Sequence, residues 1–91
     1  MQVTIADGSP MPKYPNLLRS TGMDGTARMR FVVDTLGRAE LATAVDVDAS
    51  HPAFAFAIRS TLPRMRFTPA LVGGRPVRQL VELPVIFRVG R

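Results

Sequence analysis

A proline inside the strongest strand signal limits how this chain can fold. Between Val77 and Val89 apolar side chains occupy every second position except Gln79, which is the period of a strand with one face in a core. Pro84 lies within this run, and proline has no N–H to donate to a neighbouring strand. Because such prolines are confined to sheet edges and bulges, the sequence predicts that this last strand is an edge strand.

The position of Pro84 also predicts which backbone groups face the open edge. Both backbone groups of a strand residue point to one side, and those of the next residue point to the other. If Pro84 points outward, its even-numbered neighbours do so too, and residues 79, 81, 83 and 85 bond inward. The outward set, which we expect to bind a partner peptide by strand addition, is Arg78, Leu80, Glu82, Pro84 and Ile86. The alternative is an edge that proline and charge protect against pairing.

The middle of the chain predicts a β-hairpin. Apolar and polar residues alternate over residues 25–34 and again over residues 39–47, as in half-buried strands. The segment between them, Asp34-Thr35-Leu36-Gly37, has the composition of a turn, and its glycine can adopt a positive φ. The two strands are therefore expected to be antiparallel neighbours.

Two helices are also predicted. A short one over residues 14–22 has Pro15 in its first turn and Gly22 at its end. A longer one has Ser50 as its N-cap and stops or kinks at Pro63. The apolar face of the longer helix consists of Phe54, Ala57, Ile58 and Leu62.

This order of elements predicts an α+β fold with the sequence α-β-β-α-β. Two helices should cover the one apolar face of a three-stranded antiparallel sheet with strand order 2-1-3. Residues 1–13, which contain Gly8, Ser9, Pro10 and Pro12, are expected to form a linker or extended lead-in. Residues 14–91 are expected to form the single domain.

The residue types argue against an enzyme, a metal site and a cofactor site. The chain has no cysteine, and His51 is its only histidine. A metal centre needs three or four converging ligands, whereas Asp46 and Asp48 belong to a strand end and His51 to a helix start. A polar turn and cap is therefore the favoured interpretation. No serine has a nucleophile-elbow context, and residues 73–74 (Gly-Gly) indicate a turn rather than a phosphate loop.

The charge leaves nucleic-acid binding open as an alternative. Twelve Lys and Arg against seven Asp and Glu give a net charge of +5, which suits acidic partners of several kinds. The alternation places Phe31 and Phe87 under the helices, however. The opposite face then carries Arg28, Arg30, Arg78 and Arg88 without an aromatic side chain to stack on bases. We therefore expect no nucleic-acid partner, with a basic-sheet nucleic-acid binder as the rival hypothesis.

Four segments, in order, resemble motifs of one protein family. They are Pro12-Lys13-Tyr14-Pro15; Gly25 to Asp34 with Gly37-Arg38-Ala39; Met65-Arg66-Phe67-Thr68-Pro69-Ala70; and Gly74-Arg75-Pro76-Val77 with Leu83-Pro84-Val85-Ile86-Phe87. They are similar to the P-x-Y-P opening, the G-x-V-x-V-x-F-x-V hairpin, the R-F-x-P-A segment and the G-x-P-V…V-P-I-x-F end of TonB C-terminal domains. The resemblance runs from Pro12 to Val89.

The resemblance implies the receptor-binding domain of a TonB-type energy transducer. Such proteins are anchored in the inner membrane, cross the periplasm, and bind the TonB box of outer-membrane receptors by strand addition at the third strand. They couple proton-motive force to active uptake of siderophores and similar ligands. The resemblance assigns residues 78–86 to receptor binding, and it gives Tyr14, Pro15, Phe67 and Pro69 structural roles.

The resemblance also implies parts that this sequence does not contain. No apolar run is long enough to span a bilayer, so the membrane anchor and the contacts to the inner-membrane motor are expected in a missing N-terminal region of a longer protein. The alternative is a TonB-like envelope module that mediates another interaction, or that forms a homodimer through its open edge strand.

Overall fold

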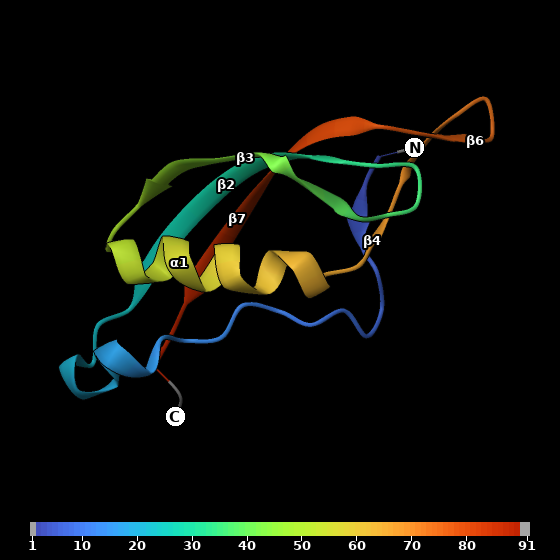
Figure 1. Ribbon diagram of the computed structural model, residues 1–91. Helices are drawn as coiled ribbons and strands as arrows, with labels where there is room; N and C mark the ends of the chain where they lie inside the picture. The colour runs from blue at the N-terminus through green and yellow to red at the C-terminus, as the bar shows by residue number, and fades with distance from the viewer. Residues whose placement is uncertain (1, 90–91) are drawn as a thin grey trace.

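The computed structural model describes residues 2–89, and its central element is a three-stranded antiparallel sheet in the order β3-β2-β7 (Figure 1). The strands are β2 (Gly25–Val33), β3 (Ala39–Ala49) and β7 (Gln79–Phe87). The predicted α+β class and the strand order 2-1-3 are confirmed. Because β7 is paired on one side only, it is the edge strand that Pro84 indicated.

The strand β2 is the centre of the sheet and of the core. Ala27, Met29, Phe31 and Val33 are at most 1% exposed, because every second residue of β2 faces the helical layer. The pairing of β2 with β7 is regular from Gly25↔Phe87 to Val33↔Gln79, without a register shift. The parity of β2 is therefore transmitted directly to β7.

One helix, α1 (Pro52–Thr61), lies across the apolar face of the sheet (Figure 1). It is followed at once by a 3₁₀ turn, η2 (Leu62–Arg64), which contains Pro63. The earlier helical segment is also a 3₁₀ helix, η1 (Asn16–Thr21), and it ends at Gly22, which has φ 66°. Both predicted helices are present, and α1 is replaced by a tighter turn where the ring of Pro63 is incompatible with a continuing α-helix.

The predicted N-cap of the longer helix is wrong by one residue. His51, not Ser50, is the cap: its backbone is extended, and its Nδ1 accepts a hydrogen bond from the N–H of Ala53 at 3.0 Å. Ser50 directly follows β3 and is still bonded to β2, since its N–H donates to the carbonyl of Thr26 at 2.9 Å and its Oγ accepts from the N–H of Thr26 at 3.0 Å. The helix cap therefore lies one residue later than residue preference alone suggested.

The strand β3 departs from the regular alternation predicted for residues 39–47. Its pairing with β2 contains two register shifts. At the second shift Thr43 Oγ1 accepts from the N–H of Val32 at 2.9 Å and donates to the carbonyl of Glu40 at 2.6 Å, taking the place of backbone partners. As a result Leu41 and Val45, which the alternation groups with the core-facing Ala39, are 49% and 56% exposed.

Two short ribbons extend the fold beyond α1. The strand β1 (Thr4–Ile5) pairs antiparallel with β4 (Phe67–Thr68). The strands β5 (Ala70–Val72) and β6 (Arg75–Val77) form a hairpin that projects past the end of the sheet (Figure 1). The predicted turn at residues 73–74 joins β5 to β6, with φ of 56° and 79° at its two glycines. Among residues 2–89, no helix is long and apolar enough to cross a membrane.

The hairpin turn between β2 and β3 is joined to β4 at Gly37. This residue has φ 81°, and its carbonyl accepts a hydrogen bond from the N–H of Phe67 at 2.9 Å. Asp34 Oδ1 completes the turn by accepting from the N–H groups of Leu36 and Arg38 at 2.9 and 3.0 Å. A Cβ at position 37 would run into the backbone carbonyl of Phe67, so glycine is needed for space as well as for conformation.

We expect Gly37→Ala to lower the free energy of unfolding by at least about 2 kcal/mol, because a left-handed alanine costs about 1–2 kcal/mol and the bond to Phe67 adds about 1 kcal/mol. Gly8→Ala is the matched control: Gly8 has φ 78°, but no atom lies within 4 Å of the point that a Cβ would occupy there. Urea denaturation followed by circular dichroism measures both. Equal losses in the two variants would show that the approach of Gly37 to Phe67 does not constrain the fold.

Candidate functional site

The hydrogen bonds of β2 determine which way the backbone of β7 faces. The N–H of Val32 donates to Thr43 on β3, and Thr26 exchanges hydrogen bonds with Ser50 at the end of the same strand. Even-numbered residues of β2 therefore direct their backbone groups to β3, and odd-numbered ones direct theirs to β7.

The register carries this parity across to the open edge. Ala27, Met29 and Phe31 lie opposite Val85, Leu83 and Val81, so the odd-numbered residues of β7 bond to β2. The residues of β7 whose backbone groups point away from β2 are Leu80, Glu82, Pro84 and Ile86. This is the predicted parity. Arg78 precedes the first residue of β7, Gln79, so it flanks the row rather than belonging to it.

The outward-bonding residues place their side chains on the sheet face opposite α1. Leu80 and Ile86 are 60% and 65% exposed there. Between them, the Glu82 carboxylate pairs with Arg28 at 3.2 Å and with Arg30 at 3.3 Å. The open edge thus has an apolar side chain on each side of an ion-paired centre.

An ion-pair ladder crosses this face from one edge of the sheet to the other. Arg28 on β2 reaches Glu82 on β7 and also Asp48 on β3, with Nε 3.1 and 3.2 Å from the two carboxylate oxygens of Asp48. Arg78 holds Glu40 on β3 by two hydrogen bonds of 2.6 and 2.8 Å. Three of the four arginines expected to make this face basic, Arg28, Arg30 and Arg78, are therefore paired with acids, which reduces the net charge that the face offers to a phosphate backbone.

The ion pairs shift the titration of their carboxylates. The hydrogen bond from Arg78 lowers the pKa of Glu40, and the hydrogen bond from Arg28 lowers the pKa of Asp48; in each case partial desolvation opposes the shift. Arg28, Arg78 and Asp48 are solvent-exposed and Glu40 is partly exposed, so water and salt screen the pairs strongly.

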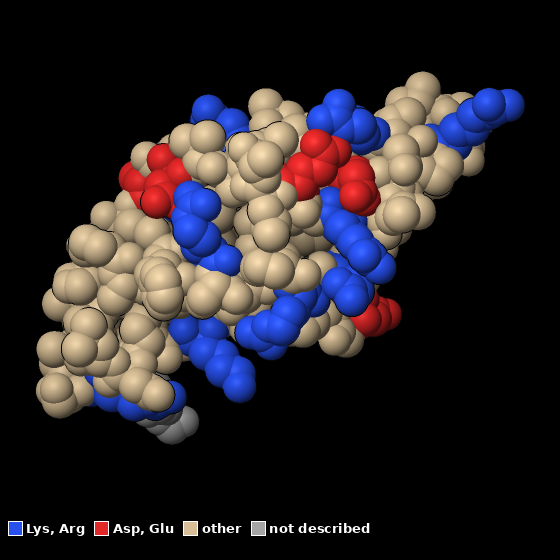
Figure 2. All heavy atoms as spheres, in the orientation of Figure 1, with Lys and Arg blue, Asp and Glu red and all other residues tan. Residues whose placement is uncertain are grey.

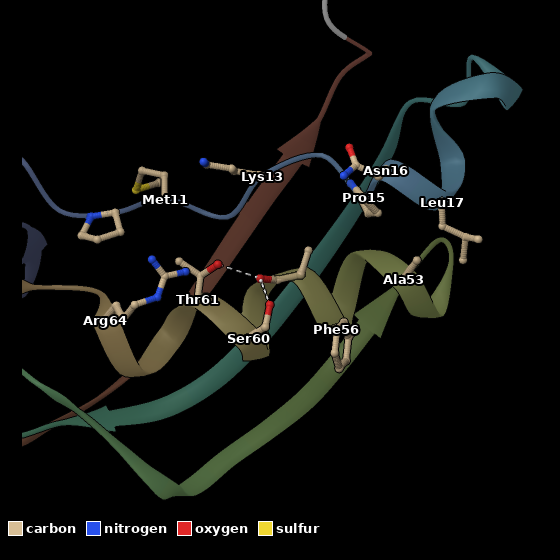
Figure 3. Close-up of a pocket in the computed structure, with 12 residues that line it drawn as sticks. Met11, Lys13, Pro15, Asn16, Leu17, Ala53, Phe56, Ser60, Thr61 and Arg64 are labelled. Carbon is tan, nitrogen blue, oxygen red and sulfur yellow. Dashed lines mark hydrogen bonds between the residues drawn. The ribbon is translucent and has the colours of Figure 1, made fainter.

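A large hollow lies on the other face of the molecule, between residues 10–17 and α1 (Figure 3). It has a volume of about 720 Å³ and a mainly apolar lining that includes the exposed side chains of Leu17 and Phe56. Lys13 and Arg64 are its charged lining residues. The hydroxyls of Ser60 and Thr61 donate back to the carbonyl of Ala57, so they are engaged within the helix.

A smaller hollow of about 140 Å³ adjoins the edge strand itself. One wall consists of Val3, Thr4 and Ile5, and the other of residues 81–83 of β7. The core side chains Phe31 and Phe67 form its floor. This hollow was not predicted from the sequence, because residues 1–13 were interpreted only as a linker or extended lead-in. The β-branched run Val3-Thr4-Ile5 was the available signal.

The structure keeps the chemistry-bearing polar residues apart. Asp46 pairs with Arg59 at 2.9 Å, Asp48 pairs with Arg28, and His51 caps α1. Over residues 2–89, no group of three or more His, Cys, Asp or Glu side chains is placed to hold a metal ion. In the same range, no buried side-chain nitrogen or oxygen lacks a hydrogen-bond partner.

The four motif residues expected to have structural roles, Tyr14, Pro15, Phe67 and Pro69, lie outside the edge strand β7. The Tyr14 hydroxyl donates to the carbonyls of Leu18 and Met23, and its ring meets Phe54 edge-on with centroids 5.8 Å apart. Pro15 occupies the N-cap position of η1. Phe67 is 6% exposed, with its ring 5.6 Å from that of Phe31, and Pro69 separates β4 from β5.

This arrangement of strands and motifs agrees with the family comparison. A family model described as the Gram-negative bacterial TonB protein C-terminal matches residues 10–89. The chain belongs to the TonB C-terminal domain family. The resemblance of the four segments is thereby confirmed.

Two solved structures share the fold of this TonB C-terminal domain. The solution NMR structure of the Pseudomonas aeruginosa TonB C-terminal domain is 20% identical, with a TM-score of 0.75, and the alignment covers 99% of this chain and 89% of that one. The TonB2 protein of Vibrio anguillarum is 24% identical, with a TM-score of 0.72, and the alignment covers 100% and 86%. No curated protein sequence matches the chain.

The lowered pKa values of Asp48 and Glu40 predict that part of the stability of this TonB C-terminal domain is lost in acid. Unfolded Asp and Glu titrate near pH 3.9 and 4.3, so the ladder stabilises the fold above about pH 4 and ceases to do so as the pH falls through the lowered native values. Thermal unfolding between about pH 6 and pH 2.5 at low ionic strength should show a smaller decrease in melting temperature for Glu40→Gln/Asp48→Asn than for the wild type.

The control for this measurement is Asp7→Asn, which removes a carboxylate outside the ladder. Adding 1 M salt should also reduce the difference between the wild type and the double variant, because the pairs are exposed. A double variant whose melting temperature follows the wild type at every pH would show that the ladder does not contribute.

Proposed function

We propose that this domain is the peptide-docking module of a TonB-type energy transducer, and that it binds an extended TonB-box segment of an outer-membrane receptor as an added strand beside β7. One observation carries the proposal: the backbone groups of Leu80, Glu82 and Ile86 point away from β2 along a strand without a register shift. A row of outward donors and acceptors on a regular edge is what strand addition requires.

The energetics favour weak and reversible docking. Three residues with both backbone groups outward, together with the Pro84 carbonyl, could make about six or seven hydrogen bonds at about 0.5–1.5 kcal/mol each. Association costs about 4–15 kcal/mol of rigid-body freedom. An isolated peptide should therefore bind with a dissociation constant on the order of micromolar or weaker, and tethering within a larger assembly would strengthen it.

The proposal extends to the cellular role through family membership. The domain acts in the periplasm as a binding domain rather than as an enzyme. A membrane anchor in another part of the full-length protein connects it to an inner-membrane motor. The domain then transmits the effect of proton-motive force to a receptor that takes up siderophores or comparable ligands.

The charge distribution weighs against the nucleic-acid alternative. Figure 2 shows basic side chains spread along the molecule, with acidic groups beside several of them, rather than gathered into one track. On the sheet face opposite α1, Arg28, Arg30 and Arg78 are each paired with a carboxylate. A dimerisation module stays an alternative that would use the same edge, so a dimer and a bound peptide would compete for β7.

The test is an NMR titration of the ¹⁵N-labelled domain with short extended peptides, including TonB-box-like ones. We expect the largest shifts at the amides of Leu80, Glu82 and Ile86. Leu80→Pro removes one outward N–H and should weaken binding about tenfold, because a lost hydrogen bond with an unsatisfied partner costs about 1–3 kcal/mol. Leu80→Ala, which keeps the N–H, is the matched control and should weaken binding less than about threefold.

Two outcomes would reject this function. Peptides that leave the β7 amides unmoved would remove the docking role. Salt-sensitive binding of single-stranded DNA to the Arg28–Arg30 face would support the nucleic-acid alternative instead. Sedimentation across a concentration series separates peptide binding from self-association through the same edge.

A further inference from the structure

We propose that the small hollow between β1 and β7 is a subsite for one apolar side chain of the docked peptide, and that β1 forms the outer wall of this subsite. This inference rests on the proposed docking at β7 and adds to it a position-specific preference. The preference concerns the partner residue that pairs with Val81 or Leu83, on the face opposite the Glu82 side chain.

The hollow lies where a side chain of an added strand would arrive. Its lining includes Val81, Glu82 and Leu83 at the middle of the edge strand. Because Glu82 uses its backbone groups outward, residues paired with Val81 and Leu83 would lie at non-hydrogen-bonded positions of an antiparallel addition. Opposed side chains are closest at such positions, and they point to the same face of the sheet as Val81 and Leu83.

The lining selects an uncharged, apolar group. The side chains that line it are apolar except for those of Thr4 and Glu82, and the rings of Phe31 and Phe67 lie buried at its base. The Glu82 carboxylate does not enter the hollow, because it is held on the opposite face by Arg28 and Arg30. A charged partner side chain would therefore lose water at this position without gaining an ion pair.

The size of the hollow restricts the group further. An apolar cavity of about 150 Å³ is large enough to hold a benzene-sized guest. The present hollow, at about 140 Å³, therefore suits a leucine, isoleucine, valine or phenylalanine side chain. Alanine would leave most of it empty, which sacrifices the dispersion contacts of its walls.

The wall formed by β1 is held in place by strand pairing, core packing and hydrogen bonds. Thr4 and Ile5 pair with Thr68 and Phe67, and Val3 packs against the core. Two further hydrogen bonds hold the segment after it: Ala6 N–H donates to the Arg66 carbonyl at 3.0 Å, and Arg66 N–H donates to Ser9 Oγ at 2.9 Å. Without β1 the hollow would be an open shelf beside β7.

The test uses the whole domain and the capped peptide acetyl-Thr-Thr-Thr-Leu-Thr-Thr-Thr-amide, in which one apolar residue sets the register. Parallel peptides carry Ala, Phe or Lys at the centre. We expect the Leu and Phe peptides to bind at least about tenfold more tightly than the Ala peptide, and the Lys peptide to bind no better than the Ala peptide. The methyl groups of Val3, Ile5, Val81 and Leu83 should shift with the Leu peptide.

Two variants on the same strand and face provide the matched comparison. Val81→Phe fills the hollow and should abolish the advantage of Leu over Ala in the peptide. Val85→Phe makes the same change at a partly buried position that does not line the hollow, and it should preserve that advantage. The ¹⁵N spectrum checks the fold of each variant, and the peptide series in the wild-type domain decides the matter if either variant misfolds.

The outcomes separate the subsite from the docking role. If every peptide shifts the amides of Leu80, Glu82 and Ile86 with equal affinity, the edge docks strands and the subsite is wrong. If no peptide shifts those amides, the docking role itself fails and the subsite fails with it. A Leu advantage that persists in Val81→Phe would place the apolar contact elsewhere on the domain.

Discussion

The regular pairing of β2 with β7 is the constraint on which the other features depend. Nine consecutive residue pairs without a shift carry the parity of the most buried strand to the edge of the sheet. That parity puts Leu83 and Phe87 in the core, Leu80 and Ile86 on the open face, and the backbone of Glu82 toward solvent. A slip of one residue would exchange all of these positions at once.

The contrast with β3 shows how much irregularity the sheet tolerates away from this pairing. The β2–β3 side contains two register shifts, and Thr43 bridges one of them with its hydroxyl. These shifts leave Val45 on the surface but keep Asp48 opposite Arg28, so the ion-pair ladder still crosses all three strands. The register shifts are thus confined to the pairing of β2 with β3, on the side of the sheet away from the candidate site on β7.

The sequence predicted those features that depend on local pattern. The alternation in β2 and β7 and the lone Pro84 were sufficient for the strand order and for the outward parity. The register shift near Thr43 was not predictable, because it arises where Thr43 substitutes for a backbone partner of a residue eleven positions away. The pairing of β1 with β4 joins residues more than sixty positions apart, and a two-residue strand has too few residues to show a period. The ion pairs likewise join distant segments, so composition gave the number of arginines but not their partners.

Pro84 has a consequence for which strands the edge admits. A foreign strand that pairs with β7 meets one proline and loses one donor. Two copies of β7 that paired with each other would bring two prolines, one from each copy, and would lose two donors wherever the paired segment includes both prolines. At about 0.5–1.5 kcal/mol per hydrogen bond, the second lost donor disfavours self-association relative to pairing with a foreign strand. A single imino acid in the middle of the strand therefore lets an exposed edge discriminate between a copy of itself and a different chain.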